Sequence, residues 1–262
     1  MPNTYATGLR LQYDDAGRGE PALLCLPGWC GSRAVFGPLV SRCSHHRRTL
    51  AVDWRGRGGS EVTSADFGSG DLVDDALAVI GASGVHQVIP VALAHAGWVA
   101  IELRRRLGDR VPKLVLLDWI ITEPPPPFVE VLNGLQSPER WLQTRETLFA
   151  MWLTGVSSAS VTAYVRDDMA TYGFDMWARA AREISAAYAQ AGSPLAALAA
   201  LDPPASVLHL FAQPDDPAYL AAQERFTGAH PWFTARKLEA HSHFPILEVP
   251  DPVAAAIERF AG

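Results

Sequence analysis

Short runs of mostly apolar residues recur along this chain and are separated by stretches with a helical pattern. The runs lie at residues 22–26, 49–52, 87–92, 114–117, 206–211 and 234–239. Most show no alternation of polar and apolar positions, which is typical of strands that are buried on both faces of a parallel sheet. Between two of them, residues 71–83 place Leu72, Ala76, Val79 and Ile80 on one helical face. The pattern therefore predicts an α/β fold with a mostly parallel sheet that helices cover on both sides.

Two regions depart from this alternation. Near the start, we expect residues 9–13 and 22–26 to begin the sheet as a hairpin. Residues 122–201 instead open with four prolines at 124–127, which we interpret as a stiff spacer, and continue as an aromatic-rich helical segment. These aromatics can form the core of a second lobe or roof an apolar pocket, and we expect both uses. We divide the chain into a core of residues 1–121 and 202–262 and a helical cap of residues 122–201.

Composition narrows the class of protein. A chain of 262 residues is long enough for one core plus an insertion, and a net charge of −6 without a basic block argues against a nucleic-acid partner. No run approaches the roughly 18 apolar residues of a membrane span, and residues 1–8 do not resemble an export signal. Three cysteines at spacings unlike any metal site suggest a reducing compartment. We expect a cytoplasmic protein without membrane partners.

The chemistry-bearing residues follow the predicted strands, where open α/β sheets bind their ligands. Residues 92–97 have the small-residue pattern of a nucleophile elbow, but the nucleophile position holds Ala94, which has no attacking atom. Residues 26–30 follow an earlier strand, where folds with a nucleophile elbow place the second donor of an oxyanion hole. The backbone N–H groups of Trp29 and His95 are therefore predicted to converge on one anionic oxygen.

His243 follows the last predicted strand. The loop at residues 26–30, the turn at residues 53–60, the elbow at residues 92–97 and His243 each follow a predicted strand, in the order that is typical of an α/β-hydrolase fold. We predict that His243 is a catalytic base, with His241 as a weaker competitor. Its acid partner is Asp118, at the end of residues 114–117, or one of Asp215 and Asp216 after residues 206–211. We favour Asp118, since the later pair lies in a proline-rich run typical of a surface turn.

A base and an oxyanion hole without a nucleophile cannot form an acyl-enzyme. They can remove a proton from an acidic hydroxyl of the substrate and hold the resulting anion. The sequence thus predicts an activated substrate that supplies its own reactivity. Position alone leaves open whether the His95 side chain touches this substrate.

Taken together, motifs spread over nearly the whole chain are similar to those of the cofactor-free 3-hydroxy-4(1H)-quinolone 2,4-dioxygenases. They are LPGWC (26–30), DWRGRG (53–58), HAGW (95–98), LLDW (116–119), SPERW (137–141), MATYGFDMW (169–177), QAGSP (190–194), HPWF (230–233) and HFPILEVPD (243–251). The motifs within residues 122–201 are more specific than the others, which many α/β-hydrolases share.

This resemblance implies a reaction and roles for individual residues. His243, paired with Asp118, would remove the 3-hydroxyl proton of a quinolone, and the anion would react with dioxygen without a metal, flavin or other cofactor. The ring would open to carbon monoxide and an N-acylanthranilate. His95 would hold the C4 carbonyl of the substrate, and Trp152 would line the pocket.

The sequence also departs from the quinaldine-degrading branch of this family. Where that branch carries polar side chains, this chain has Gly31, Leu93 and Ala94. We expect a less polar, roomier pocket and a 2-alkyl substrate with a chain longer than methyl. Two other functions stay open: a small-molecule receptor that has lost the nucleophile, and a lyase or an esterase that uses water as nucleophile.

Overall fold

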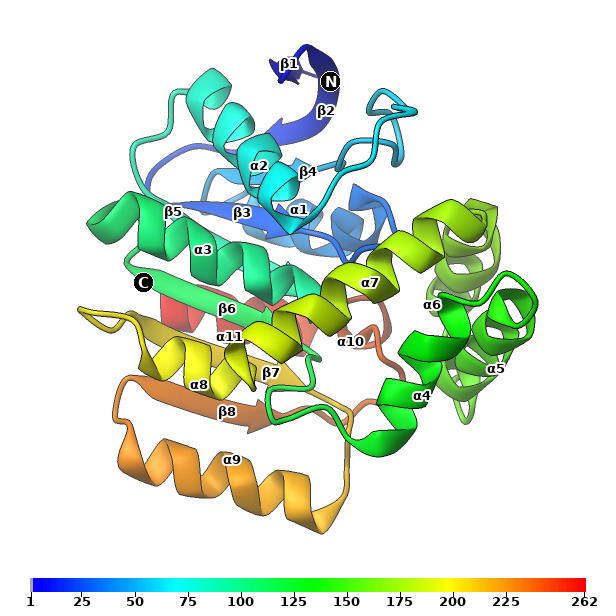
Figure 1. Ribbon diagram of the computed structural model, residues 1–262. Helices are drawn as coiled ribbons and strands as arrows, with labels where there is room; N and C mark the ends of the chain where they lie inside the picture. Colours follow the sequence, from blue (N-terminus) through cyan, green and yellow to red (C-terminus); the bar gives the residue numbers. More distant parts are fainter. Residues whose placement is uncertain (1) are drawn as a thin grey trace.

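A single eight-stranded sheet organises the computed structural model, which describes residues 2–262 (Figure 1). In space the strand order is β1-β2-β4-β3-β5-β6-β7-β8. The strands are β1 (Asn3–Ala6), β2 (Leu9–Ala16), β3 (Ala22–Leu26), β4 (Thr49–Val52), β5 (Val88–Leu93), β6 (Lys113–Leu117), β7 (Ser206–Phe211) and β8 (Phe233–Lys237). All pairs from β4 to β8 are parallel, whereas β1–β2 and β2–β4 are antiparallel. This confirms the predicted α/β fold.

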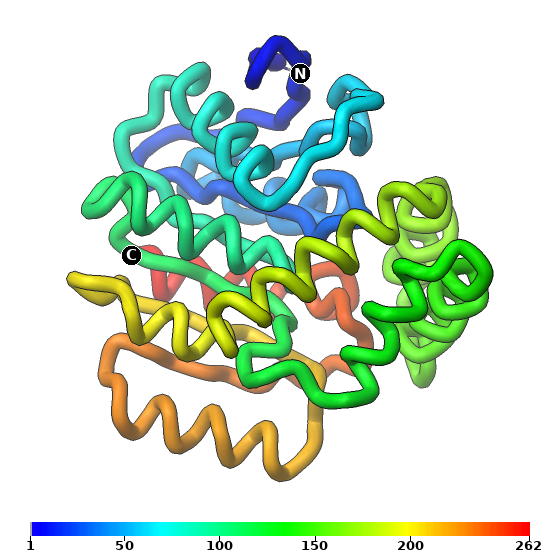
Figure 2. Tube along the Cα trace, viewed as in Figure 1, coloured from blue at the N-terminus to red at the C-terminus, as the bar shows by residue number. Residues whose placement is uncertain are grey.

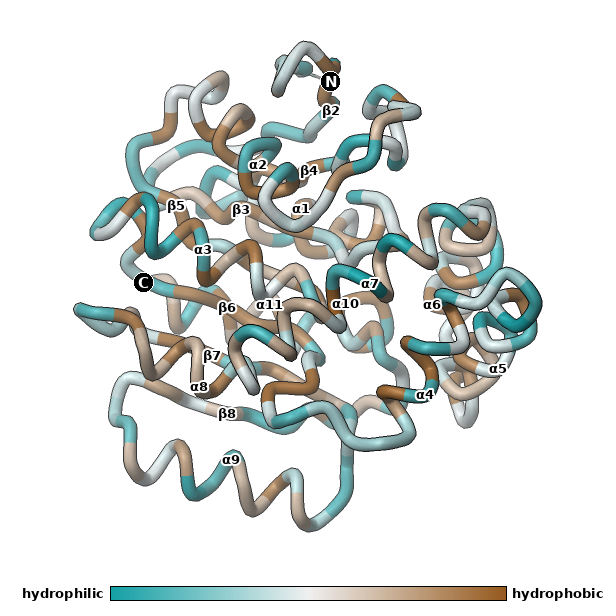
Figure 3. The backbone as a smooth tube through the Cα atoms, viewed as in Figure 1, coloured by the Kyte–Doolittle hydropathy of each residue, from teal (hydrophilic) through white to brown (hydrophobic). Residues whose placement is uncertain are grey.

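Helices cover both faces of the sheet. On one face α2 (Ser69–Ser83), α3 (Gly97–Leu107) and α8 (Pro194–Ala199) pack side by side, and on the other α1 (Gly37–Cys43) packs against α11 (Pro250–Ala261) (Figure 1). The central strands are hydrophobic over most of their length (Figure 3) because both faces are buried. Within residues 2–262, none of the helices combines the length and apolar character that a membrane crossing requires.

The apolar runs predict the strands well. Three of them coincide with β3, β4 and β7, and the others differ from β5, β6 and β8 by one or two residues at an end. The predicted helix at residues 71–83 lies within α2, and its four apolar positions are all buried. These runs work as signals because a strand covered on two faces has few alternatives to apolar side chains.

The predicted N-terminal hairpin is wrong in its partners. β2 pairs with β1 through the two-residue turn at Thr7 and Gly8, both with positive φ, and with β4 on its other edge. β3 instead lies between β4 and β5. The completely buried run of β3 suits a central strand, whereas the partly exposed β2 suits a place near the edge.

Between β6 and β7, five α-helices and two short helical turns form an insertion that stands mostly to one side of the sheet (Figure 2). Its helices are α4 (Pro126–Leu135), α5 (Trp141–Leu153), α6 (Ala159–Ala163), α7 (Phe174–Ala191) and α8. The prediction of a proline spacer is only half right, because Pro126 and Pro127 form the first turn of α4, where a missing N–H costs nothing. The boundaries of a cap at residues 122–201 stay a prediction.

The elbow after β5 packs tightly against the segment after β6. Gly97 begins α3, and a Cβ atom built on it would lie 2.1 Å from a ring carbon of Trp119. The Trp119 side chain is 1% exposed, so it has no free volume into which it can move. A glycine is therefore required at this junction.

We expect Gly97→Ala to lower the free energy of unfolding by about 1–3 kcal/mol, the usual cost of overpacking a core. Denaturant unfolding measures it. The matched control is Gly81→Ala on α2, where a Cβ atom meets nothing within 4 Å and helix propensity adds up to about 1 kcal/mol of stability. Equal effects of the two substitutions would contradict this packing account.

Candidate active site

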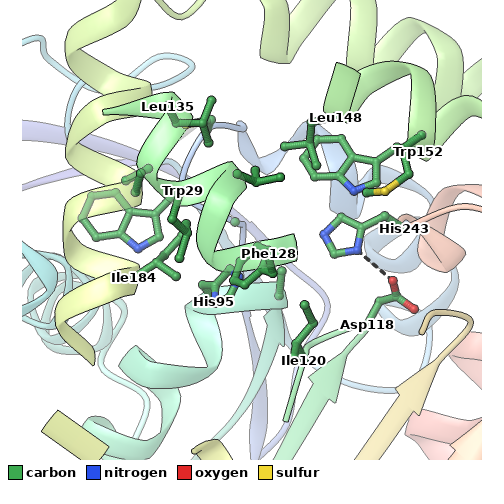
Figure 4. A pocket seen from close by; sticks show the side chains of 18 of the residues that line it. Trp29, His95, Asp118, Ile120, Phe128, Leu135, Leu148, Trp152, Ile184 and His243 are labelled. Atoms are coloured by element: carbon green, nitrogen blue, oxygen red, sulfur yellow. Dashed lines mark hydrogen bonds and ion pairs between the residues drawn. The ribbon is translucent and has the colours of Figure 1, made fainter. Parts of the chain in front are cut away.

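A cavity of about 350 Å³ lies beyond the carboxyl ends of β3, β5 and β6 and below α4, α5 and α7 (Figure 4). Most of its wall is apolar. The polar side chains in the wall are those of His95, Asp118, Tyr164, Gln213 and His243. Few polar groups in an apolar, concave site are typical of a small-molecule pocket.

The structure brings His243 and Asp118 together at one end of this cavity. Nδ1 of His243 lies 2.8 Å from Oδ2 of Asp118, and the other ring nitrogen points into the pocket (Figure 4). Oδ1 of Asp118 accepts the backbone N–H groups of Ala212 at 2.6 Å and Gln213 at 3.0 Å. The carboxylate is 2% exposed, so both of its oxygens are satisfied inside the protein.

The competing candidates lie elsewhere. Asp215 forms a surface ion pair with Lys237, and Asp216 caps the N-terminus of α9 (Pro217–Ala229). The side chain of His241 is exposed. Of the residues considered from sequence, only Asp118 is within hydrogen-bond distance of His243. Their catalytic roles stay a prediction.

Several buried polar groups, which sequence reasoning did not assign to the site, hold the turn that carries Asp118. Asp118 itself has a positive φ of 45°. The backbone N–H of Trp119 points at Nε2 of His209 at 3.5 Å, and the Tyr219 hydroxyl donates to the Trp119 carbonyl at 2.7 Å. Nδ1 of His209 lies 2.7 Å from Oε1 of Gln223. A histidine inside an otherwise apolar strand was the available signal.

The elbow has the expected strained geometry. Ala94, at the nucleophile position, has a φ of 49°, and the chain enters α3 three residues later. The loop after β3 approaches it closely, since a Cβ atom on Gly28 would lie 3.8 Å from the Leu93 carbonyl oxygen. Trp29 and His95 both line the cavity and lie near each other in its wall (Figure 4).

The buried guanidinium of Arg57 holds the loop that carries Trp29. Arg57 donates through Nε to the Trp29 carbonyl at 2.6 Å and stacks over the Trp29 ring, with 5.1 Å from the guanidinium carbon to the ring centroid. Burial lowers the pKa of Arg57 to about 10, so the guanidinium is still charged at neutral pH. Its contacts fix the position of the Trp29 backbone.

His95 lies in an aromatic environment without a charged partner. Nδ1 of His95 accepts the indole N–H of Trp119 at 3.1 Å, and Phe128 stacks on the imidazole with 5.4 Å between ring centroids. Burial, with a smaller effect from nearby His243, lowers the pKa of His95 to about 3. His95 is therefore neutral at any working pH and can serve only as a neutral hydrogen-bonding group.

Aromatic residues of the insertion serve both predicted purposes. Trp152 stacks on the imidazole of His243 with 4.9 Å between ring centroids and an angle of 14° between the planes. Trp177 also lines the cavity, whereas Phe149 packs behind it and is completely buried. The family resemblance implies Trp152 in the pocket, but nothing in the sequence indicates that it stacks on His243.

The pocket is apolar, as Leu93 and Ala94 lead one to expect, but it is not roomier at Gly31. A Cβ atom at Gly31 would lie 1.8 Å from the Tyr164 hydroxyl oxygen. This hydroxyl points toward the Ser32 carbonyl at 3.4 Å. A tyrosine from the insertion thus fills the volume that the glycine leaves, and the expectation of extra space at this position is wrong.

No group of three or more His, Cys, Asp or Glu side chains in the described part of the chain is arranged to hold a metal ion.

Comparisons with known proteins agree with this geometry. The model of the alpha/beta hydrolase family matches residues 23–256. A 2-heptyl-3-hydroxy-4(1H)-quinolone dioxygenase from Mycobacteroides abscessus is 39% identical, over 97% of this chain and 96% of its own length. A 1H-3-hydroxy-4-oxoquinoline 2,4-dioxygenase from Pseudomonas putida is 34% identical over 99% of both chains.

Among solved structures, an AqdC variant in complex with its substrate superimposes with a TM-score of 0.95, at 37% identity over 100% of this chain and 99% of the other. That structure is described as the basis for recognition and ring-cleavage of the Pseudomonas quinolone signal. This chain belongs to the 3-hydroxy-4-quinolone dioxygenases of the alpha/beta hydrolase family. Membership in these dioxygenases confirms the resemblance seen in the motifs.

The buried histidines of this dioxygenase predict how its stability depends on pH. Burial lowers the pKa of His209 from the ordinary 6.5 to about 4. Between these values the unfolded chain binds a proton at this residue that the folded protein does not bind. The free energy of unfolding therefore falls as the pH falls from 6.5 to 4, by up to about 1.4 kcal/mol per pH unit for one such residue.

Denaturant unfolding at several pH values measures this slope, and His95 contributes with the same sign down to about pH 3. We expect a shallower slope in His209→Gln, whose amide can both donate and accept without binding a proton. Parallel losses of stability in the wild type and the variant would argue that His209 is not the group responsible.

Proposed function

We propose that this dioxygenase opens the ring of 2-alkyl-3-hydroxy-4(1H)-quinolones with dioxygen, and that it releases an N-acylanthranilate and carbon monoxide. The observation that carries the proposal is the His243–Asp118 pair, which faces an apolar cavity where the nucleophile position is an alanine. Such a site can remove a proton but cannot form an acyl-enzyme. The full-length dioxygenase relatives support the same chemistry.

In the first step, the cavity-facing nitrogen of His243 accepts the 3-hydroxyl proton of the quinolone. Asp118 stabilises the imidazolium through the hydrogen bond to Nδ1, since a carboxylate beside a histidine favours its charged form. Trp152 adds to this, because its stacked ring offers a π face to the new cation. The proton transfer thus needs only side chains of this protein.

In the next steps, the electron-rich anion reacts directly with dioxygen. The peroxide formed at C2 closes onto C4, and ring opening expels C3 as carbon monoxide, so that the two atoms of dioxygen end in the acylanthranilate. The backbone N–H groups of Trp29 and His95 are the proposed donors to the oxyanion, and the His95 side chain the proposed donor to the C4 oxygen. In this scheme neither a metal nor another cofactor takes part.

The walls of the cavity favour an alkyl substituent on the quinolone. The apolar side chains come from α4, α5 and α7. They include Val131, Leu132, Leu135, Leu148, Ala180 and Ile184. An unbranched alkyl chain would be removed from water on contact with these residues, which stabilises binding. This supports a 2-alkyl substrate over an unsubstituted one.

Neither alternative function accounts for the site as well. A small-molecule receptor needs no base, yet His243 and Asp118 are held at hydrogen-bond distance. An esterase or a lyase could use the base but does not explain the relationship to dioxygenases over nearly the full chain.

We also propose a cytoplasmic location without nucleic-acid or membrane partners. The free, buried thiols of Cys25, Cys30 and Cys43 support this location.

We expect His243→Ala to lower kcat by about two to four orders of magnitude, the range supplied by positioned proton transfer. Substrate binding without oxygen should survive, because the apolar walls are unchanged. Oxygen consumption in steady state measures turnover. His241→Ala is the control and should stay close to the wild type, since that side chain is exposed. Near-normal turnover of His243→Ala would rule out this base.

A series of 2-alkyl-3-hydroxy-4(1H)-quinolones from methyl to nonyl tests the proposed substrate. Each buried CH₂ stabilises binding by roughly 0.8 kcal/mol, or about fourfold in affinity, so kcat/KM at fixed oxygen should rise along the series until the cavity is filled. The result against the proposal would be a flat profile or a maximum at methyl.

A further inference from the structure

The indole of Trp119 makes a hydrogen bond that determines which nitrogen of His95 carries the proton. An indole N–H can only donate, so Nδ1 of His95, 3.1 Å away, must offer its lone pair. A neutral imidazole carries one proton, which then resides on Nε2. The low pKa of His95, about 3, keeps the ring in this neutral form.

The donor is held rigidly in place. Trp119 is 1% exposed, with its ring against Gly97 on one side and the edge of Trp98 at 5.0 Å between ring centroids. Its backbone N–H and carbonyl form hydrogen bonds with His209 and Tyr219, respectively. The indole N–H therefore cannot turn away from His95 without disturbing the core.

Within residues 2–262, the Trp119 indole is the only hydrogen-bond donor to Nδ1 of His95. The ring centroid of Tyr188 lies 5.8 Å from that of His95, but the Tyr188 hydroxyl donates to the Ile120 carbonyl at 2.5 Å. Phe128 covers a face of the imidazole and has no polar atom. Among the described residues, Nδ1 thus has the Trp119 indole as its hydrogen-bond partner, and His95 lines the cavity.

We propose that Trp119 is the positioning residue that keeps His95 as an Nε2–H donor toward the C4 oxygen of the bound quinolone. This inference rests on the proposed function and deepens it. The opposite tautomer would present a lone pair to an oxygen on which negative charge develops, so the attraction would become a repulsion. Trp119 therefore determines the sign of this interaction although it does not touch the substrate.

The test compares two matched tryptophans. Trp119→Phe removes the donor and keeps an aromatic ring. Trp98→Phe is the control: it lies in the same aromatic cluster, but its indole N–H has no hydrogen-bond partner within residues 2–262. We expect kcat/KM for a 2-alkyl-3-hydroxy-4(1H)-quinolone to fall about tenfold in Trp119→Phe and less than twofold in Trp98→Phe. Equal losses in the two variants overturn the proposal.

Two readouts separate positioning from a general effect on packing. In anaerobic absorbance titrations, the pKa of the bound substrate's 3-hydroxyl should rise by about one unit in Trp119→Phe and stay unchanged in Trp98→Phe. In a double-mutant cycle, Trp119→Phe should cause no further loss once His95 is alanine. An unchanged substrate pKa, or losses that multiply independently, overturn the proposal.

A measurement on the wild type decides the tautomer even if Trp119→Phe fails to fold. Nitrogen NMR of protein labelled in its histidine rings should show His95 protonated at Nε2 and bare at Nδ1 at neutral pH. The reverse assignment overturns the inference. If the wild type consumed no oxygen with any quinolone, the proposed function would fail, whereas this spectrum would still report on the Trp119–His95 bond.

Discussion

The hydrogen bond between Asp118 and His243 is the contact on which the rest of the site depends. It joins the end of β6 to the loop after β8, and the two residues are 125 positions apart in the chain. Asp118 adopts a positive φ at this place, a conformation that a non-glycine residue adopts at an energetic cost. Two backbone N–H groups that follow β7 stabilise the charge. The parallel sheet brings all three segments to one edge.

The two histidines of the cavity lie in different environments, which suit the two different roles that we propose for them. His243 has the Asp118 carboxylate at Nδ1 and the Trp152 ring stacked on its face, and both contacts suit the imidazolium that the proposed proton transfer would produce. His95 has an indole donor and a phenyl ring around it and stays neutral. One ring can accept a proton while the other donates a hydrogen bond at the same pH. With Ala94 at the elbow, the residues present match chemistry that removes a proton and then stabilises an anion.

Much of this could be predicted from the sequence, because it depends on local patterns. Completely buried strands such as β3 require continuous apolar runs. Ala94, Asp118 and His243 each follow one of the strands, in a fixed order along the chain. What could not be predicted depends on packing between distant residues. The hydroxyl of Tyr164 occupies the space beside Gly31, and the indole of Trp119 bonds to His95, 24 residues away. The partners of β2 were missed because the short strand β1 is partly exposed and has no apolar run.

We propose that this site cleaves a quinolone ring with dioxygen by base catalysis alone. The most direct test is to treat the purified protein with a chelator, remove the chelator and any bound flavin, and supply 2-heptyl-3-hydroxy-4(1H)-quinolone. Oxygen consumed, carbon monoxide released and acylanthranilate formed are then measured in the same reaction. We expect one carbon monoxide and one acylanthranilate for each dioxygen consumed, with turnover unaffected by the treatment. Loss of activity that an added metal or flavin restores, or product formed without oxygen uptake, would contradict it.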